Sequence, residues 1–142
     1  MYLLDTNVVS ELRKAGTNKI DHNVQLWASQ LTVPDLYLSV ITLLELEMGI
    51  LLLERKDSEQ GAILRSWFDE YVIPAFSGRI LDIDSTIALH CAALHVPDHQ
   101  SDRDALIAAT ALVHGMTVVT RNIADFEPTG VALLNPWLEQ KK

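Results

Sequence analysis

The chain has 142 residues, a formal net charge of −8 and a pI of about 4.9, and 49% of its residues are hydrophobic. A chain of this length has room for one hydrophobic core, so we expect a single domain spanning 1–142. An acidic surface excludes nucleic-acid binding by general electrostatic attraction, so any such contact must be local, through a few cations or a bound metal ion.

Short apolar strands alternate with helices along the chain. The first strand, YLLD (2–5), is followed by predicted helices over 6–14 and 24–31, a strand over 36–41, and helices over 42–55 and 61–76. A strand over 78–84 and a helix over 85–95 follow, then a loop (96–102), a helix (103–115), a strand (116–120), a loop (122–130) and a strand (131–135). This order is typical of an α/β fold with a parallel sheet covered on both faces.

The cysteine content and the distribution of charged residues in apolar segments predict where the protein is located. Cys91 is the single cysteine and cannot form an internal disulfide, so we expect a reducing compartment, the cytoplasm. The apolar run 38–53 contains Glu45 and Glu47, which makes it too charged and too short to span a bilayer. Asp5 interrupts the N-terminus where the apolar region of a signal peptide would lie. We therefore expect no membrane partner.

Four acidic residues occur near the ends of predicted strands or helices. Asp5 ends the first strand, and Glu45 lies in the first turn of the helix after the second. Asp104 lies in the first turn of helix 103–115, and Asp125 follows the strand 116–120 by a short loop. Parallel strands all exit at one edge of their sheet, where ligands bind in such folds. The four carboxylates should therefore converge, although they come from distant parts of the chain.

Each acid also has a simpler structural explanation. Converging carboxylates repel one another unless a cation neutralises them, and a set of oxygen ligands favours Mg²⁺ or Mn²⁺. Acids are also common near helix starts without any metal, because they cap the helix or interact favourably with its dipole. The simpler alternatives are an N-cap at Asp5, Thr6 or Asn7, capping boxes at Thr42–Glu45 and Ser101–Asp104, and an Asx turn at Asp125.

Four segments together resemble a known family. LLDTNVVSEL, TLLELEMG, DALIAATALVHGMTVVTRNIADF and a late NPW are similar to the PIN-domain ribonucleases, specifically the FitB-like branch of the VapC toxins of type II toxin–antitoxin systems. The resemblance covers nearly the full chain. It implies a single PIN-like domain, an α/β/α sandwich around a mostly parallel sheet of four to five strands, with an acidic, metal-binding site that cleaves RNA.

The resemblance also assigns residues. It implies that Asp5, Glu45, Asp104 and Asp125 are catalytic, with Asp5 and Asp104 as principal metal ligands and Glu45 and Asp125 as further candidates. It implies supporting roles for Thr6, Asn7, Thr120 and Asn122, and Arg121 is a candidate substrate contact. The implied cofactor is Mg²⁺, with Mn²⁺ as an alternative. Asp102 is interpreted as a cap of the following helix.

The family further implies a reaction and partners. We expect hydrolysis of RNA phosphodiester bonds that leaves a 5′-phosphate, inhibition by a VapB-type antitoxin, and operator DNA binding only through that antitoxin. We expect a homodimer, because helix 42–55 and the segment 67–76 carry more apolar surface than a small domain buries. A metal-dependent DNA nuclease or phosphatase and a non-catalytic PIN-fold binding module remain alternatives.

Two groups of residues are not assigned to the site. His90 and His95 are five residues apart on one predicted helix, a poor spacing for sharing a face, so we expect packed or surface histidines. The aromatic residues Trp27, Trp67, Phe68 and Tyr71 lie at helical spacing with aliphatic residues, and we expect them in the core or in a dimer interface.

Overall fold

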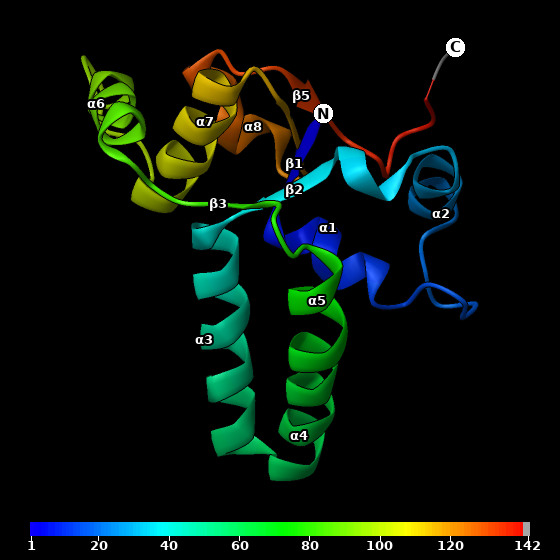
Figure 1. Ribbon diagram of the computed structural model, residues 1–142. Coiled ribbons are helices and arrows are strands. Elements are labelled where there is room, and N and C mark those ends of the chain that lie inside the picture. Colours follow the sequence, from blue (N-terminus) through cyan, green and yellow to red (C-terminus); the bar gives the residue numbers. More distant parts are fainter. Residues whose placement is uncertain (141–142) are drawn as a thin grey trace.

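The computed structural model describes residues 1–140, and its centre is a five-stranded sheet (Figure 1). All strand pairs are parallel, in the order β3–β2–β1–β4–β5. The strands are β1 (Tyr2–Leu4), β2 (Leu36–Ser39), β3 (Ile80–Leu81), β4 (Thr117–Val119) and β5 (Leu133–Leu134). The predicted α/β class and parallel sheet are confirmed.

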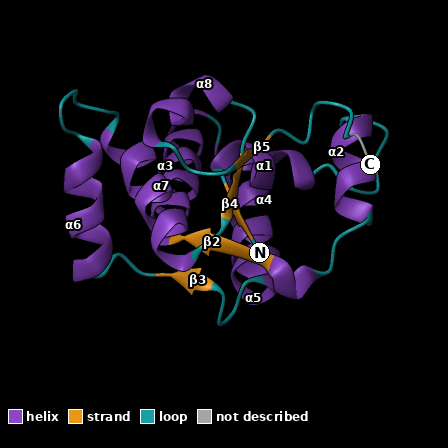
Figure 2. Cartoon of the chain, turned by 90° about the horizontal axis from the view of Figure 1, so that it is seen from above, coloured by secondary structure: helices purple, strands orange, loops and turns teal. Residues whose placement is uncertain are grey.

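Helices cover both faces of this sheet, as the view from above shows (Figure 2). They are α1 (Thr6–Leu12), α2 (His22–Ser29), α3 (Val40–Lys56), α4 (Ser58–Trp67), α5 (Ile73–Ala75), α6 (Ser85–Leu94), α7 (Asp102–His114) and α8 (Ile123–Phe126). None of the described helices combines the length and the apolar character needed to cross a membrane.

The alternation of β1 explains the two layers of core. Leu3 and Leu4 are both fully buried, but consecutive strand residues point to opposite faces of a sheet. Leu4 packs in a cluster with Trp27 from α2 and Ile50 from α3. Leu3 packs in a second cluster with residues of α7 and α8, including the fully buried Phe126. A run of apolar residues in so short a strand therefore joins both halves of the molecule.

Several predicted boundaries are wrong. Helix α3 begins at Val40 and is capped by Ser39, whose hydroxyl accepts the backbone N–H of Ile41 at 3.0 Å. The strand predicted over 36–41 therefore ends two residues earlier. Helix α2 begins at His22, capped by Asp21. The loop predicted over 122–130 contains α8 and a 3₁₀ turn, and the helix predicted over 61–76 begins at Ser58 and includes a π-helical turn over 68–72.

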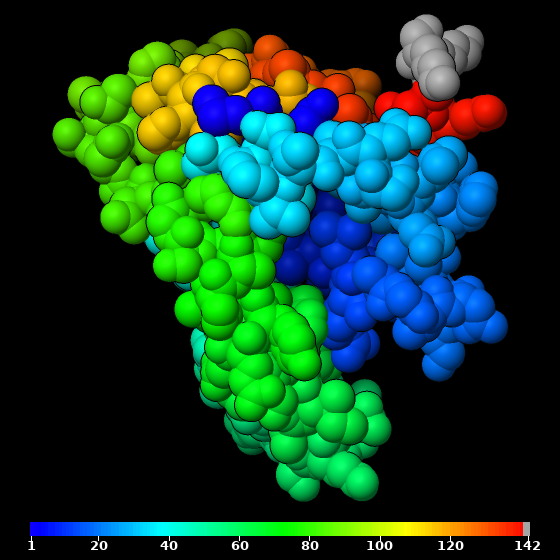
Figure 3. Space-filling model, turned by 45° about the vertical axis from the view of Figure 1, so that its right-hand side comes forward, coloured from blue at the N-terminus to red at the C-terminus, as the bar shows by residue number. Residues whose placement is uncertain are grey.

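Helices α3 and α4 form an antiparallel arm that projects from the body of the molecule (Figures 1 and 3). Arg65 of α4 bridges the two helices through both of its terminal nitrogens, with contacts of 2.6 and 2.5 Å to Glu47 of α3. Gly61 permits the close approach, because a Cβ there would lie 2.6 Å from the Cα of Glu54. The arm forms one side of the groove described below.

We expect Gly61→Ala to destabilise the protein. The added methyl group would overlap the backbone of α3, and overpacking of this kind costs about 1–3 kcal/mol. Gly49→Ala is the matched control, because Gly49 lies in α3 with no atom near its missing Cβ, and alanine is the better helix former there by about 1 kcal/mol. Thermal unfolding of the two variants should shift in opposite directions. Equal stability of Gly61→Ala and the unmodified chain would contradict the packing.

Candidate active site

Asp5 lies at the centre of the sheet edge from which the strands exit. In the sheet, β2 lies on one side of β1 and β4 lies on the other. The strand order therefore reverses between β1 and β4, and ligands bind at such a point in parallel sheets. The Asp5 carboxylate accepts the backbone N–H of Thr6 at 2.8 Å and the hydroxyl of Thr120 at 2.8 Å. Asp5 is the N-cap of α1 and is only 6% exposed. The alternative that Asp5 caps the first helix is thus correct, and it leaves open the additional role of a metal ligand.

Glu45 approaches the same edge from α3. Its Oε1 accepts the hydroxyl of Thr6 at 2.7 Å, and its Oε2 lies 3.6 Å from a terminal nitrogen of Arg103. The alternative capping box at Thr42 is wrong, because α3 already begins at Val40. Glu45 consequently lies two residues further into the helix than predicted, in its second turn, and its carboxylate is turned toward α1.

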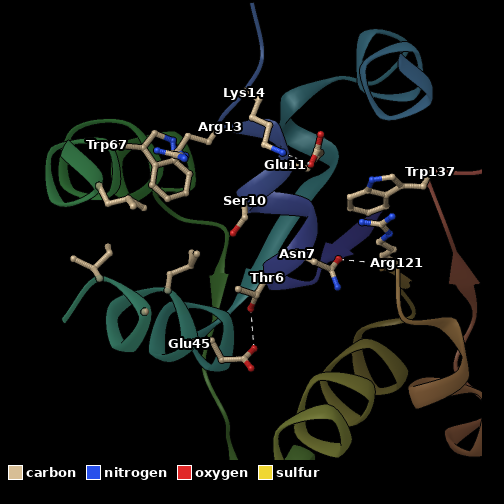
Figure 4. A pocket seen from close by; sticks show the side chains of 14 residues that line it. Thr6, Asn7, Ser10, Glu11, Arg13, Lys14, Glu45, Trp67, Arg121 and Trp137 are labelled. Carbon is tan, nitrogen blue, oxygen red and sulfur yellow. Dashed lines mark hydrogen bonds and ion pairs between the residues drawn. The ribbon is translucent and has the colours of Figure 1, made fainter. Parts of the chain in front are cut away.

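Asp104 and Asp125 complete the group, of which Figure 4 shows Glu45. Asp104 lies in the first turn of α7, as predicted, while Asp125 lies in α8. Burial raises the pKa of Asp104, and the negative charges of Asp5, Asp125 and Glu45 raise it further. Burial likewise raises the pKa of Asp5, with repulsion from Glu45 and Asp125 acting in the same direction and the hydrogen bonds from Thr120 and Thr6 opposing it. The four predicted acids therefore lie close enough to repel one another.

Polar side chains hold this group in place. Asn7 donates its amide to Asp5 at 3.4 Å and to Thr120 at 3.5 Å, while its Oδ1 accepts the backbone N–H of Arg121 at 3.2 Å. The hydroxyl of Thr120 also accepts the backbone N–H of Asn122 at 3.0 Å. Asn122 takes part in this network through its backbone N–H. Such outer contacts fix carboxylate orientation.

A groove of about 450 Å³, lined by Glu45 of this acidic group, runs between α1 and the α3–α4 arm (Figure 4). Its floor is apolar, with Leu46, Ile50 and Leu64. Its two ends carry aromatic residues: Trp67 on the arm with Arg13 beside it at 5.9 Å, and Trp137 with Arg121 at 5.2 Å, measured from guanidinium carbon to ring centroid. The groove places cations and flat side chains beside the acids.

The four carboxylates offer oxygen ligands and negative charge that a hard divalent cation would neutralise, although their ligand atoms are more widely spaced than those of the histidine cluster described below. Two of them have raised pKa values because like charges and burial disfavour ionisation, and a cation would relieve both effects. Oxygen donors of this kind suit Mg²⁺ or Mn²⁺. The guanidinium of Arg103 lies against Glu45 at the rim of the group. Asp5 and Asp104 are the residues we expect to hold the cation, with Glu45 and Asp125 beside them.

A second polar cluster lies at the α6–α7 connection. The side chains of His95, His99 and Asp102 offer ligand atoms within 4.8 Å of one another, and the two imidazole rings stack with centroids 4.4 Å apart. Nδ1 of His95 accepts the backbone N–H of Gln100 at 3.0 Å, which leaves the proton of a neutral ring on the Nε2 that faces Asp102. A protonated nitrogen cannot ligate a metal ion, so this cluster is a poor competitor of the acidic site.

The interpretation of Asp102 as a helix cap is wrong, and that of His90 as a surface residue is confirmed. Asp102 is the first residue of α7, not its cap, which is Ser101. Its carboxylate lies 3.3 Å from Nε2 of His99 and 77% of its side chain is exposed. His90 is on the surface, as expected. Histidine spacing could not predict the stacking, because the second ring lies in the connection that follows α6.

Sequence reasoning missed the walls of the groove. Trp67 is half-buried and packs against the core as expected, but it also lines the groove, while Trp27 and Phe68 are core residues and Tyr71 is 67% exposed. Trp137 received no role. The signal available in the sequence was the late NPW segment, whose position next to Arg121 only the fold reveals.

Comparison with known proteins gives a consistent result. The profile of the PIN domain family matches residues 2–128. Toxin FitB of Neisseria gonorrhoeae is 37% identical over 142 residues, covering 96% of this chain and 99% of the relative. The VapC ribonuclease Y4jK of Sinorhizobium fredii is 36% identical over 142 residues, covering 96% and 98%.

The solved structures show the same similarity in three dimensions. A chain in the structure of FitAB bound to an IR36 DNA fragment superposes with a TM-score of 0.88 at 34% identity, covering 99% of both chains. The family profile, the full-length relatives and the superposition all agree with the resemblance predicted from the sequence. The chain belongs to the PIN-domain family, and its relatives there include FitB and VapC toxins.

Proposed function

We propose that this chain is the toxin of a type II toxin–antitoxin pair, acting in the cytoplasm as a single domain that hydrolyses RNA phosphodiester bonds with Mg²⁺. The observation that carries the proposal is the convergence of Asp5, Glu45, Asp104 and Asp125 at the strand exits of a PIN domain. Relatives named as VapC ribonucleases support RNA as the substrate. The products carry a 5′-phosphate and a 3′-hydroxyl.

The chain's own residues divide the work of the reaction. Asp5 and Asp104 hold the cation, and the hydrogen bonds from Thr6 and Thr120 fix the Asp5 carboxylate. A divalent cation bound there activates water and neutralises charge on the phosphoryl oxygens. Glu45 or Asp125, whichever is left off the cation, accepts the proton of the attacking water.

The test compares RNA and DNA as substrates. Purified protein is incubated with single-stranded RNA and with DNA of the same sequence, each in Mg²⁺ and in excess EDTA. We expect cleavage of RNA alone, lost in EDTA and restored by Mg²⁺, and RNA ends that ligate as 5′-phosphates. Preferential cleavage of DNA would favour the alternative nuclease. Absence of both cleavage and metal binding would favour a binding module.

We also propose inhibition by a VapB-type antitoxin, because the acidic site attracts a basic side chain. An Arg or Lys entering the cluster would compete with Mg²⁺ for the carboxylates. Next to the groove, a second cavity of about 180 Å³ has an apolar lining that includes Val9, Tyr71 and Phe76, and it shares Arg13 and Trp67 with the groove. This surface suits an apolar antitoxin helix. Operator DNA is then bound through the antitoxin, since this chain is acidic.

We expect that replacing the antitoxin's inserted basic residue with alanine weakens inhibition roughly tenfold or more, because the interface loses a charge pair at the carboxylates. The measurement titrates the partner encoded by the neighbouring gene against RNA cleavage. A basic residue on the partner's DNA-binding end serves as the control and should leave inhibition unchanged. Undiminished inhibition by the alanine variant would show that the partner acts without entering the site.

We propose a homodimer through an exposed apolar stripe on α3. Leu44, Met48, Leu51 and Leu52 lie at helical spacing on one side of α3 and are 40–63% exposed. In the other expected contribution, segment 67–76, Phe68, Val72 and Phe76 are buried in the core, while Tyr71 is 67% exposed. Light scattering should give the mass of two chains, and Leu51→Glu with Leu52→Glu should give the mass of one. A single-chain mass for the unmodified protein at micromolar concentration would contradict the proposal.

A further inference from the structure

The NPW segment (135–137) brings an aromatic side chain to the wall of the groove. Trp137 is half-buried, and the exposed Arg121 lies over its ring at 5.2 Å. Figure 4 shows the two side chains next to each other, with Arg121 below the indole, at one end of the groove. An arginine held over a tryptophan ring by a cation–π contact keeps its charge and its outward N–H groups, so it can donate to a phosphate or lie against a base.

Polar contacts fix Trp137 in a segment without regular structure. Its backbone N–H donates to Oδ1 of Asn135 at 2.9 Å, and its carbonyl accepts the amide of Asn23 at 2.8 Å. Asn135 also donates to the carbonyl of Arg121 at 3.4 Å. These bonds link the end of the described chain to the residues that follow β4. Trp137 also packs against the core, so its position is fixed from both sides.

The pair is held at a fixed position relative to the acids. Asn7 joins them directly, because its amide donates to Asp5 at 3.4 Å while its carbonyl oxygen accepts the backbone N–H of Arg121 at 3.2 Å. One side chain therefore separates a proposed metal ligand from the backbone of Arg121. A nucleotide bound at Arg121 would lie next to the phosphodiester held at the acids.

The charge of the chain makes this arginine important. RNA approaching four carboxylates on a chain of net charge −8 needs local cations. Several other cations are already paired: Lys14 with Glu11 at 3.1 Å, Arg65 with Glu47 at 2.5 Å, and Arg103 with Glu45 at 3.6 Å. Arg121 has a tryptophan as its neighbour, which orients the guanidinium without neutralising its charge.

We propose that Arg121 and Trp137 form a nucleotide subsite that binds an unpaired residue of the RNA strand beside the scissile phosphate. The guanidinium stacks with the base and contacts the flanking phosphate, and the indole holds the guanidinium flat. The opposite wall, at Trp67 and Arg13, opens into the apolar second cavity and suits a protein segment instead. This inference rests on the proposed function for its substrate, and it predicts recognition of a single-stranded region.

The experiment separates binding from chemistry. Steady-state cleavage of a single-stranded oligoribonucleotide is measured for Arg121→Gln, Trp137→Leu and the conservative Trp137→Phe. We expect KM to rise about tenfold for the first two, since stacking contacts of this kind contribute a factor of this order, with kcat within about twofold. Trp137→Phe should keep most of the affinity, because phenylalanine also supports the guanidinium. Arg55→Gln, an exposed residue near the end of the arm, is the control for the loss of one positive charge.

A second readout does not depend on cleavage. Binding of the same oligoribonucleotide in EDTA should quench the tryptophan fluorescence of the unmodified protein, and Trp137→Phe should remove most of the quenching, because Trp27 is buried and Trp67 lies on the opposite wall. Quenching without cleavage would refute the proposed function and retain the subsite. Unchanged KM in Arg121→Gln, an equal effect of Arg55→Gln, or variants that impair antitoxin binding alone would overturn the subsite.

Discussion

Asp5→Asn is expected to reduce RNA cleavage by about 10²–10³-fold or more while the protein stays folded. The loss follows because Asp5 is the most buried of the four acids and is the residue from which the proposed metal site is built, and removal of one preorganised electrostatic group commonly costs this much. Asparagine has almost the same shape. It can still accept the backbone N–H of Thr6 as an N-cap, so α1 should be preserved.

The measurement is single-turnover cleavage of RNA in Mg²⁺, together with a thermal unfolding curve. Asp82→Asn is the matched control, since Asp82 follows β3 directly and is exposed. His90→Ala, an exposed change on α6, should also leave cleavage intact. Full activity in folded Asp5→Asn would remove Asp5 from the site, whatever the reaction of the unmodified chain.

Asp104→Asn is expected to lower cleavage to a similar extent and, in the absence of metal, to raise stability. Burial and repulsion from Asp5, Asp125 and Glu45 raise the pKa of Asp104, so its charged form destabilises the native state at neutral pH. Neutralising a repelled charge typically gains about 1 kcal/mol. The unfolding temperature should rise by about 3 °C.

The pH dependence has a defined sign. Because the native pKa lies above the ordinary value of 3.8, the native state binds this proton more readily than the unfolded state does. The metal-free protein therefore gains stability from Asp104 as the pH falls through the raised pKa, and loses it as the pH rises. The stability difference between Asp104→Asn and the unmodified chain should be largest at neutral pH and disappear below about 3.8.

Excess Mg²⁺ should reverse the order of stability. Ligand binding to the native state stabilises it by about 2.7 kcal/mol at a hundred times the dissociation constant, and only the chain with an intact site benefits fully. Unfolding curves of Asp104→Asn and of the unmodified chain, each with and without Mg²⁺, give the four unfolding temperatures that this comparison requires. If metal-free Asp104→Asn were less stable than the unmodified chain, the carboxylates would not repel one another in the native state as we infer.

The sequence by itself determined the class of fold and the identity of the acidic group. Short apolar strands such as YLLD cannot bury both faces unless helices cover both, so the parallel sheet followed from composition and order. Asp5 could be singled out because parallel strands exit at one edge of the sheet, and Asp104 because it lies in the first turn of the helix that leads into the next parallel strand, so both lie at that edge. The boundaries of the second strand could not be predicted, because Ser39 and Val40 suit either a strand end or a helix start until packing decides.

Tertiary structure alone decided what surrounds the acids. Glu45 could have closed a capping box, and only the start of α3 at Val40 turned its carboxylate toward Thr6. Arg121 and Trp137 are sixteen residues apart, and no local periodicity relates them. They meet because β4 and β5 are neighbours in the sheet, so the segments that follow both strands lie side by side at its edge. Contacts between segments that are distant in sequence depend on strand order, which local patterns do not encode.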